Sequence, residues 1–476
     1  MKKLFFTCFL LFVNFIQSQE LKTIELLQPE SKELNDLSFL KDELEEKQII
    51  MLGEQTHMYG NIFEMKARIV EYLHQELGFT TIAMESSMYD IYKMNKSGFN
   101  SKDFNNAIWG VWSNTLEFQR VVNYIDKNNL KVIGFDSQVN NTSQFVEDFY
   151  AYCESQNITF QLDEDDFGII IEGILENVTV EEDDIIYKVY EKELNRILEQ
   201  IENLEDSDTN YYWKQFTKSL LACSQDAYYN KKEIITTDLG NKNHNIRDKQ
   251  MADNLLSYIN RNSSEKIICW ADNIHIINDN SSIKKPIAKE FISMGSYIKK
   301  ELKNKSYSLA TIHANDSLLD LGTKKWHSTP IKSNSFEYQL NNINKPYLFV
   351  TSSQEEMKSI KTTRLLNFVD FTEAKLDQLH DGYVFFKKAT LPKLETKKDS
   401  ISISNKQLDL GKRIEQIEIG QNVILKGQLL DKQTNEPIPF ATLILKKEEI
   451  YRVADENGFY ELPVKKTMLQ NVSVAI

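Results

Sequence analysis

The sequence predicts an α/β fold in which a mainly parallel central sheet carries helices on both faces, with a helical insertion and a small C-terminal β-sandwich. Three observations support this. Short apolar runs recur through the first 390 residues, helical spacings of apolar residues lie between them, and the composition changes after residue 392. The chain has 476 residues, of which 41% are hydrophobic and 26% are charged, so it is long enough for more than one folded unit.

Seven β-rich apolar runs are the expected strands of the central sheet. Several lack the alternation with polar residues that a half-exposed strand shows, and this is typical of strands covered on both faces of a parallel sheet. The runs are QIIML from 48, TTIAM from 80, KVIGF from 131, KIICW from 266, SYSLATI from 306, YLFV from 347 and YVFF from 383.

Helices are expected between these strands. In residues 62 to 77 apolar side chains recur at steps of three and four, and Gly78 stands where a left-handed cap would end the helix. Residues 118 to 125 repeat the spacing. Strand and helix in alternation predict parallel strands with right-handed crossovers. From about 140 to 250 the strand signal fades, and long charged amphipathic patterns predict a helical insertion that packs over the sheet.

The N-terminus has the order of a secretory signal peptide over residues 1–19: MKK, an apolar run from Leu4 to Ile16, then QSQE. The apolar run is shorter than the roughly 20 residues that span a bilayer. We therefore expect a periplasmic or secreted protein with no membrane span after signal removal. Export would leave three cysteines, Cys153, Cys223 and Cys269, without metal-ligand spacing. These three cysteines could form one disulfide, but the sequence does not require it. Cys269 is expected to be a buried, inert thiol.

The charge balance bears on the class of partner. The net charge is −14, and no basic stripe is present, which argues against nucleic acid as a partner. Many of the acidic residues lie between 161 and 185, where we expect them to form the solvent-exposed surface of helices. A small molecule is the more natural partner.

The C-terminal region differs from the rest. Residues 393–420 are rich in Lys, Ser and Asn and are predicted to be a linker between an α/β domain at 20–392 and a second unit at 421–476. That unit shows short alternating strands with turn signals at 435–437 and 455–458, typical of a β-sandwich. Its segments GQLLDKQTNEPIPFATL and ADENGFYEL resemble the carboxypeptidase regulatory-like domain, which implies an accessory module for docking in the cell envelope.

Polar residues follow four of the predicted strands at the point where each strand ends. Ligands of parallel α/β sheets bind outside these carboxyl ends, because loops and helix N-termini converge there. We therefore expect acids and imidazoles from separate segments to meet at one edge. The residues are Glu54, His57, Glu85, Asp136, Asp272, Asn273 and His275.

Each of these residues alone has an ordinary structural explanation: Glu85 could cap a helix, Asp136 could begin a loop and His275 could be a satisfied core histidine. Their convergence favours function. An imidazole with a pKa of about 6.5 suits proton transfer near neutrality, and a nearby carboxylate fixes its tautomer and stabilises the protonated ring. The adjacent Glu54 and His57 are therefore predicted to activate water or a hydroxyl.

Two alternatives remain at this point. A metal site built from Glu54, His57, Glu85 and His275 is chemically reasonable, but the spacing is not that of His-Glu-x-x-His. We thus expect no cofactor while leaving a divalent metal open. The same cleft could also serve a non-enzymatic envelope protein that binds metal or haem. Serine catalysis lacks its signal, since no Gly-x-Ser-x-Gly elbow is present.

The segment GEQTHMYGNIFEMKARIVEYLHQELGFTTIAMES resembles the erythromycin esterase family. The similarity continues through GFDSQ at 134, IRDKQMADN at 246 and WADNIHI at 270, and it covers residues 45 to 390. It implies an α/β hydrolase unrelated to the serine-triad fold, in which a histidine activates water to open an ester and no cofactor is obligatory.

The resemblance implies catalytic roles for four residues. His57 would be the general base, Glu54 and Glu85 would orient and polarise, and His275 would position water or substrate. Implied substrate-binding residues are Lys66, Arg68, Asp136, Asp272 and Asn273.

Two of these residues depart from the family and a third has a rival explanation. Lys66 stands where the family often has Arg, and lysine cannot form a bidentate fork. Asp272 stands where macrolide-resistance members have His, so the sequence predicts hydrolysis of an ester or lactone, with a link to antibiotic response, and leaves macrolides open. For Arg68, a local pair with Glu64 is the alternative.

Overall fold

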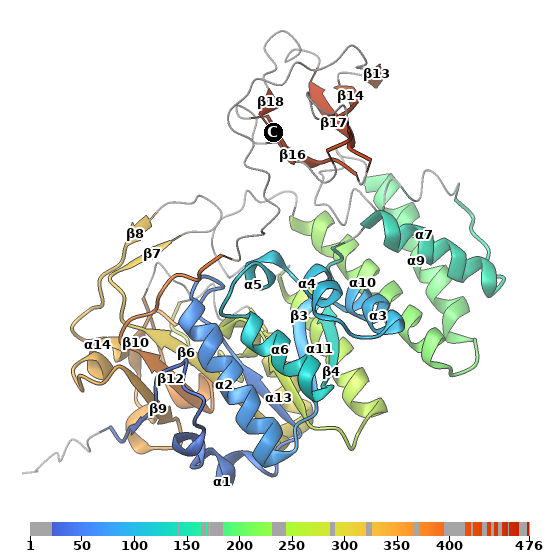
Figure 1. The fold of residues 1–476 in the computed structure, drawn as a ribbon. Helices are drawn as coiled ribbons and strands as arrows, with labels where there is room; N and C mark the ends of the chain where they lie inside the picture. Colours follow the sequence, from blue (N-terminus) through green and yellow to red (C-terminus); the bar gives the residue numbers. More distant parts are fainter. Residues whose placement is uncertain are drawn as a thin grey trace, which may run out of the picture. The chain divides into compact units, whose positions relative to one another are not determined.

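The computed structural model describes two units, residues 1–395 and 396–476. The first unit contains the large sheet and its helices (Figure 1). The ranges described are 21–140, 142–162, 168, 171, 184–230, 244–285, 291–319, 326–365, 371–394, 415–419, 422–430, 436–438, 442–445, 450–455, 457–465 and 474–475. The predicted signal peptide lies outside them.

The central sheet has eight strands in the order β1-β9-β12-β6-β2-β5-β3-β4. The six strands from β12 to β4 are parallel, and β9 and β1 complete one edge in antiparallel pairing. The predicted fold class is confirmed, all seven predicted runs form strands of this sheet, and β1 is an addition. The bounds are β1 Ile24–Glu25, β2 Ile49–Leu52, β3 Thr81–Ser87, β4 Lys131–Asp136, β5 Ile267–Trp270, β6 Ser306–His313, β9 Tyr347–Thr351 and β12 Gly382–Phe386.

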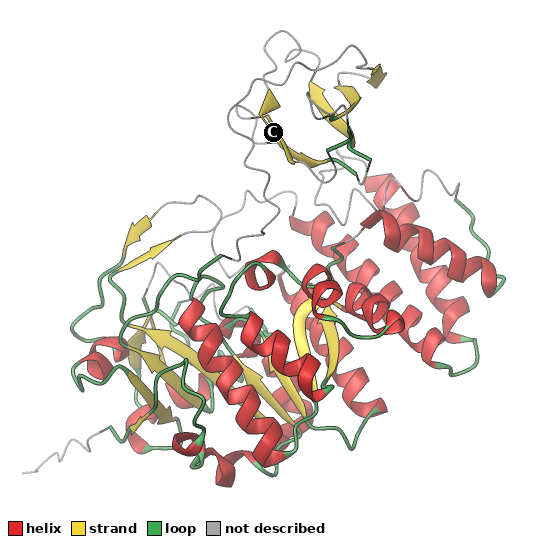
Figure 2. Cartoon of the chain, viewed as in Figure 1, coloured by secondary structure: helices red, strands yellow, loops and turns green. Residues whose placement is uncertain are grey.

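Helices cover both faces of the sheet (Figures 1 and 2). Apolar side chains of α2 and α6 pack with the strands in one core cluster, and those of α11 and α13 form another on the opposite face. The helix α2 ends as predicted, because Gly78 has φ of 72° and closes it in the left-handed region. The bounds are α1 Leu40–Leu44, α2 Gly60–Leu77, α3 Met88–Ser97, α4 Ser101–Ala107, α5 Gly110–Ser113, α6 Gln119–Asn128, α11 His244–Arg261, α13 Met294–Leu302, α14 Phe336–Asn341 and α15 Leu376–Leu379.

The helical insertion is smaller than predicted. Its helices α7 (Thr142–Ser155), α9 (Asp184–Glu202) and α10 (Asp208–Asn230) share an aromatic-rich core of their own. The predicted range extends to 250, but α11 begins at His244, and its residues Met251 and Leu255 pack against the sheet. Both kinds of helix are amphipathic, so periodicity alone does not distinguish an insertion helix from the crossover between β4 and β5. Most of the acidic 161–185 segment lies outside the described residues.

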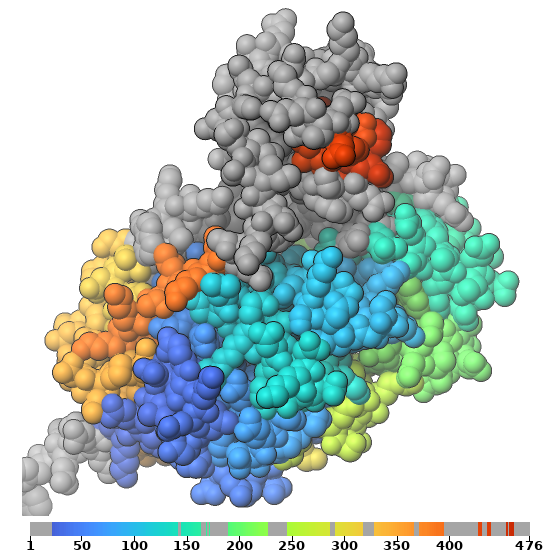
Figure 3. Space-filling view, viewed as in Figure 1, coloured from blue at the N-terminus to red at the C-terminus, as the bar shows by residue number. Residues whose placement is uncertain are grey.

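The segment after β12 ends the first unit near the predicted boundary. In Figure 3 this orange segment runs beside the cyan region around residue 115, where Thr115 and Leu394 form an isolated bridge. Two short antiparallel pairs complete the unit: β7 Ser317–Leu319 with β8 Trp326–Ser328, and β10 Lys361–Thr363 with β11 Thr372–Ala374. Among the described residues no helix combines the length and apolar character needed to cross a membrane.

The three cysteines of the described chain, Cys153, Cys223 and Cys269, are all free thiols. Cys269 lies in β5 and is fully buried, as predicted. Burial raises the pKa of its thiol well above the usual value, which keeps it in the unreactive protonated form.

The second unit, taken by itself, contains two three-stranded antiparallel sheets, β13-β14-β17 and β16-β15-β18. The strand β13 corrects the predicted linker, which was placed over 393–420, because Glu415–Ile419 pairs along its length with β14. Its charged residues alternate with isoleucines, so a composition rich in charge concealed a strand. The predicted turn at 455–458 is present, with Gly458 at φ of 76°. The bounds are β13 Glu415–Ile419, β14 Asn422–Gln428, β15 Thr442–Leu445, β16 Ile450–Val453, β17 Phe459–Lys465 and β18 Val474–Ala475.

Candidate active site

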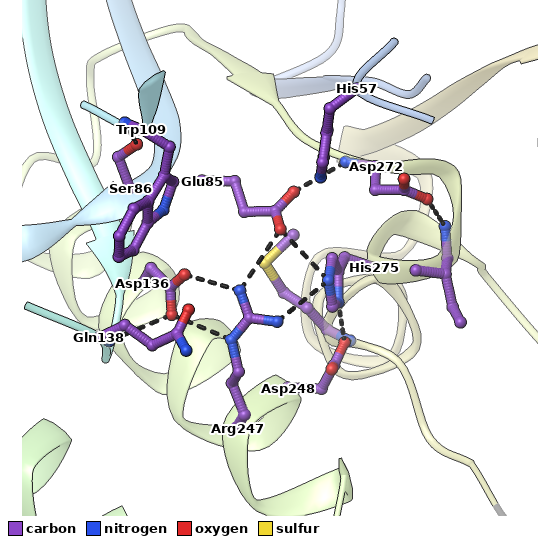
Figure 4. Close-up of polar contacts among 12 residues, drawn as sticks. His57, Glu85, Ser86, Trp109, Asp136, Gln138, Arg247, Asp248, Asp272 and His275 are labelled. Carbon is purple, nitrogen blue, oxygen red and sulfur yellow. Dashed lines mark hydrogen bonds and ion pairs between the residues drawn. The ribbon is translucent and has the colours of Figure 1, made fainter. Parts of the chain in front are cut away.

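Four neighbouring strands deliver polar residues to one edge of the sheet. The strands β2, β5, β3 and β4 are adjacent and parallel, with Trp270 of β5 paired to Leu52 on one side and Met84 on the other. The residues that follow these strands therefore emerge together, and Figure 4 shows His57, Glu85, Asp136, Asp272 and His275 gathered in one cluster. The predicted convergence is present.

Glu54, directly after β2, is a buried carboxylate with three partners. Its Oε1 lies 2.6 Å from Nδ1 of His57 and accepts a hydrogen bond of 2.7 Å from Nε1 of Trp112. Its Oε2 accepts a bond of 2.6 Å from Nζ of Lys66 on α2. Burial would raise the pKa of Glu54, but the charge of Lys66 and the bond to His57 outweigh this and lower it. Glu54 is therefore an ionised, immobilised anchor.

His57 has one bound ring nitrogen and one open ring nitrogen. Nδ1 faces Glu54, whereas Nε2 has no hydrogen-bond partner in the part of the chain that the structure describes. The side chain is 24% exposed. Burial would lower the pKa of His57, but the bond to Glu54, its charge and the charge of Glu85 raise the pKa to about 9. The ring of His57 is thus oriented by Glu54.

Lys66 is fixed from three directions. Besides its bond to Glu54, Nζ donates to the carbonyl oxygen of Ala271 at 3.2 Å and lies 4.2 Å from the centroid of the Trp270 ring. Burial lowers its pKa, and the charge of Glu54 opposes that shift. A lysine provides one ammonium for this purpose where an arginine would provide a planar fork. Its role in the site is to hold Glu54, since the ammonium is 1% exposed.

Glu85, at the end of β3, lies at the centre of a second network (Figure 4). Its Oε2 accepts a bond of 2.8 Å from the backbone N–H of Asp272, and its Oε1 lies 3.2 Å from Nε2 of His275. Nη2 of Arg247 is 3.4 Å from the same oxygen. Burial would raise the pKa of Glu85, but the charge of His275 and the bond to it hold the pKa far below its usual range. Glu85 is therefore a negative charge that faces His275 and Arg247.

Asp136, at the end of β4, is occupied by Arg247. Its Oδ2 accepts a bond of 2.7 Å from Nη2 and its Oδ1 one of 3.2 Å from Nε, which makes a bidentate pair. Asp136 is 1% exposed, so it orients Arg247, which retains 25% of its side-chain exposure.

Asp272 is the predicted binding residue that keeps an unoccupied oxygen among the described residues. Its Oδ1 accepts a bond of 3.0 Å from the N–H of Ile274, and no partner contacts Oδ2 in the described chain. Burial raises its pKa to about 6, against the opposing charge of His57. At neutral pH the group is largely ionised, and it titrates just below neutrality.

Asn273 is placed differently from the prediction that it binds substrate. Its side-chain amide donates 2.7 Å to the carbonyl oxygen of Thr311 and accepts 3.1 Å from the N–H of the same residue. It thus connects the loop after β5 to strand β6. A Cβ at Gly53 would lie 2.3 Å from its Oδ1, which explains the glycine before Glu54. Both polar atoms of the side chain are satisfied inside the fold.

Arg68 corrects a second prediction. On α2 it lies two residues after Lys66, which points it away from Lys66's side of the helix. Its guanidinium binds the Asp36 carboxylate and the carbonyl oxygen of Glu33. It is fully buried, and the alternative pair with Glu64 is absent because Glu64 pairs with Arg120 at 3.3 Å. Arg68 anchors the N-terminal segment and is not part of the cluster.

Three residues of the cluster were not selected from the sequence: Trp112, Arg247 and Asp248. The last two lie in the segment IRDKQMADN, whose resemblance to the family was visible. They are on helix α11 and follow no strand, so their place in the sequence does not mark them as residues of a strand end. The indole of Trp112 arrives from the short helix α5 and carries no charge that would signal a site.

Among the described residues no group of three or more His, Cys, Asp or Glu side chains is arranged to hold a metal ion. Both oxygens of Glu54 are occupied, and the ammonium of Lys66 lies 2.6 Å from one of them. A dication there would meet this positive charge at close range, so the residues present do not fit a metal at Glu54.

The chain was compared with known proteins. The family model described as "Erythromycin esterase" matches residues 74–389. A Bacillus subtilis (strain 168) protein named "Putative hydrolase YbfO" is 25% identical over 391 residues, which cover 75% of this chain and 86% of that protein.

Solved structures share the fold. A Bacillus cereus protein has a TM-score of 0.61 at 17% identity, covering 78% of this chain and 96% of that one. A mutant of the erythromycin esterase EreC in its open conformation has a TM-score of 0.61 at 15% identity, covering 78% of this chain and 98% of that one. Because the family model spans well over half of the sequence, the chain belongs to the erythromycin esterase family.

Proposed function

We propose that this protein is a hydrolase that cleaves an ester or lactone bond of a small molecule, with His57 as the general base that activates water. The observation that carries the proposal is the state of the two ring nitrogens of His57. One is bound to the buried carboxylate of Glu54, and the other is unpartnered among the described residues, on a side chain that is 24% exposed. This is the arrangement that proton transfer to and from a reacting group requires.

The chemistry follows from this arrangement. Neutral His57 accepts a proton at Nε2 from a water molecule while the water oxygen attacks the ester carbonyl. The imidazolium that forms is stabilised by Glu54, which in turn is held by Lys66 and Trp112. When the tetrahedral intermediate collapses, the imidazolium returns the proton to the departing alkoxide, so an acid and an alcohol are released.

Substrate contacts are proposed for the groups with free capacity. Oδ2 of Asp272 lacks a partner in the described chain, and the Arg247 guanidinium is partly exposed. Lys66 and Asp136 act through the residues they hold, since both are buried in ion pairs. A carboxyl group at 272 differs from the imidazole that macrolide-resistance members carry there, so the proposal extends to esters and lactones in general. Macrolides, and with them a response to antibiotic, are one class to be tested.

The first test is hydrolysis of simple aryl esters and of a macrolide by the full-length protein. Aryl esters report on the chemical step with little demand on binding, and the macrolide reports on specificity. We expect turnover of at least one aryl ester above the rate of buffer alone. Absence of turnover with every ester and lactone, from folded protein, would contradict the proposal.

The activity should rise with pH. The base must be unprotonated, and the pKa of His57 is about 9. We expect kcat/KM to increase about tenfold per pH unit below that value and to level off above it. Because the pKa is raised on folding, the stabilisation from protonated His57 is present below its unfolded pKa of about 6.5 and is lost as the pH rises through about 9. A rate that instead falls above neutrality would show His57 acting as an acid.

Catalysis should not need a metal. The ammonium of Lys66 lies beside Glu54, and Glu85 is engaged with His275 and Arg247. Treatment with a chelator, followed by its removal, should therefore leave kcat within about twofold of the untreated value. Loss of activity that zinc or manganese restores would replace the direct acid–base mechanism with a metal-assisted one. Stoichiometric metal without hydrolysis would favour a binding protein.

The proposal also covers location. The sequence of residues 1–19 supports export to the periplasm or medium, and the likeness of the last 55 residues to an accessory module supports docking in the envelope. The mature enzyme is proposed to start near residue 20. Mass spectrometry of the N-terminus of protein recovered from cell fractions tests both the cleavage and the compartment.

A further inference from the structure

Asp248, which the sequence search did not select, is bound to His275 on the inner side of the cluster. It lies on α11 and is 2% exposed. Its Oδ1 is 2.9 Å from Nδ1 of His275 and accepts a second bond of 2.9 Å from the N–H of Met294, the first residue of α13. Asp248 therefore connects His275 to α11 and α13. Its carboxylate is in direct contact with a ring nitrogen and is shielded from solvent.

The other ring nitrogen of His275 also faces a carboxylate. Nε2 lies 3.2 Å from Oε1 of Glu85, which comes from β3. A carboxylate accepts hydrogen bonds and cannot donate them when ionised, so a ring that satisfies both must carry a proton on each nitrogen. Nη1 of Arg247 lies 3.4 Å from Nε2, farther than Oε1 of Glu85, and Arg247 is itself paired with Asp136. The groups that face His275 are thus the negative charges of Asp248, Glu85 and Asp272 and the positive charge of Arg247.

We propose that Asp248 is a positioning residue that keeps His275 as a permanent imidazolium, which leaves His57 as the imidazole of this cluster that transfers protons. The inference rests on the proposed hydrolytic function and deepens it by giving the two histidines different roles. The shift in the pKa of His275 has the direction that this role requires. Burial would lower the pKa, but the charges of Asp248 and Glu85 raise it well above its usual value.

The fixed charge on His275 determines the geometry of Glu85. A neutral ring with a bare Nε2 would present a lone pair to Oε1 of Glu85 at 3.2 Å, and the carboxylate would turn away from it. Glu85 also accepts the N–H of Asp272 and contributes to the charge environment of His57. Asp248 therefore affects the reaction indirectly. It holds the charge of His275, and His275 in turn holds the carboxylate of Glu85.

The substitution Asp248→Asn separates charge from structure. An asparagine Oδ1 in the same place accepts the bonds from Met294 and from Nδ1–H of His275, so the tie to α13 is kept while the negative charge is removed. The matched control is Asp253→Asn on the same helix, where the carboxylate is 46% exposed and pairs only with Lys249 in the described chain. Both changes remove one charge from α11.

Two measurements are made on the full chain. Nitrogen-15 NMR of histidine-labelled protein, without substrate, follows protonation of His275 between pH 5 and 9, with assignment from the spectrum of His275→Gln. Steady-state kinetics with an aryl ester follow kcat, KM and their pH profiles. The NMR titration needs no activity, so it separates this inference from the proposed function.

We expect His275 to stay doubly protonated over the whole range in the wild type and in Asp253→Asn, and to titrate within the range in Asp248→Asn. We expect kcat of Asp248→Asn to fall about 10- to 100-fold with KM nearly unchanged, and its pH profile to gain an inflection that the control lacks. The inference is overturned if His275 in the wild type is neutral at pH 7, or if it stays charged in Asp248→Asn. The wild-type titration decides the matter even where the variant does not fold, and the expected titrations in a protein that hydrolyses no ester would uphold this inference while rejecting the proposed function.

Discussion

Replacement of His57 by alanine is expected to lower kcat for an aryl ester by about a thousandfold, because the change removes the group that we propose accepts the proton from water. The fold should be little affected. The side chain is 24% exposed, and Glu54 keeps its bonds from Lys66 and Trp112 when the imidazole is gone. The melting temperature of His57→Ala should therefore stay close to that of the wild type. Initial rates and a thermal unfolding curve measure the two quantities on the same preparation.

The control for this variant is His74→Ala. His74 is a partly exposed histidine near the end of α2, with Nδ1 2.8 Å from the hydroxyl of Tyr124, and among the described residues it has no hydrogen bond or ion pair to the cluster. It should retain wild-type kcat. A His57→Ala protein that hydrolyses the ester at the normal rate would remove His57 from the mechanism. A large fall in melting temperature would instead show that His57 is needed for the fold.

Replacement of Lys66 by methionine is expected to lower the free energy of unfolding of the first unit by about 3 to 5 kcal/mol, because it removes the buried ammonium beside Glu54 and leaves the partly exposed His57 as the cation that faces this carboxylate. Lys66 and Glu54 are 1% and 0% exposed, and their charged atoms lie 2.6 Å apart. Methionine is close to lysine in length and can keep the contact with the face of Trp270. The loss should thus report on the charge and not on a cavity. Urea denaturation followed by tryptophan fluorescence measures it.

A second substitution tests the cause. Adding Glu54→Gln to Lys66→Met removes the stranded charge, so the double variant should be more stable than the sum of the single effects predicts. Lys93→Met is the control, since its pair with Asp148 is solvent-exposed and should contribute within about 1 kcal/mol. A loss below that level in Lys66→Met would mean that water or another group reaches Glu54.

The fold was largely predictable because its signals are local. The runs at 48 and 266 each hold four consecutive apolar residues after one polar residue, and such runs are typical of strands buried on both faces of a sheet. Gly78 marked the end of α2 because a left-handed cap favours glycine. The end of the insertion was misplaced, because a helix that packs on a sheet and a helix that packs on other helices have the same amphipathic pattern. The strand β13 was missed, because its charged residues resemble the composition of a linker.

The candidate site was predictable to the extent that it consists of strand ends. Glu85 and Asp136 lie at the ends of parallel strands and Glu54, His57 and His275 follow such strands, and the topology brings these positions together whatever their side chains are. The same rule wrongly included Asn273, because it predicts where a residue lies and not what its side chain bonds to.

What the sequence determined by itself is therefore the class of fold, the edge of the sheet where chemistry is placed, and the acid and imidazole that stand there. Only the tertiary structure decided which groups are partners. It assigned Lys66 to Glu54 and turned Arg68 away to Asp36, although the two residues are neighbours on one helix. It also brought Asp248 to His275 across 27 positions of the chain. The reason is that hydrogen bonds and ion pairs depend on packing between distant elements, and the local spacing of residues, which sets only the direction of a side chain on its own helix or strand, does not encode that packing.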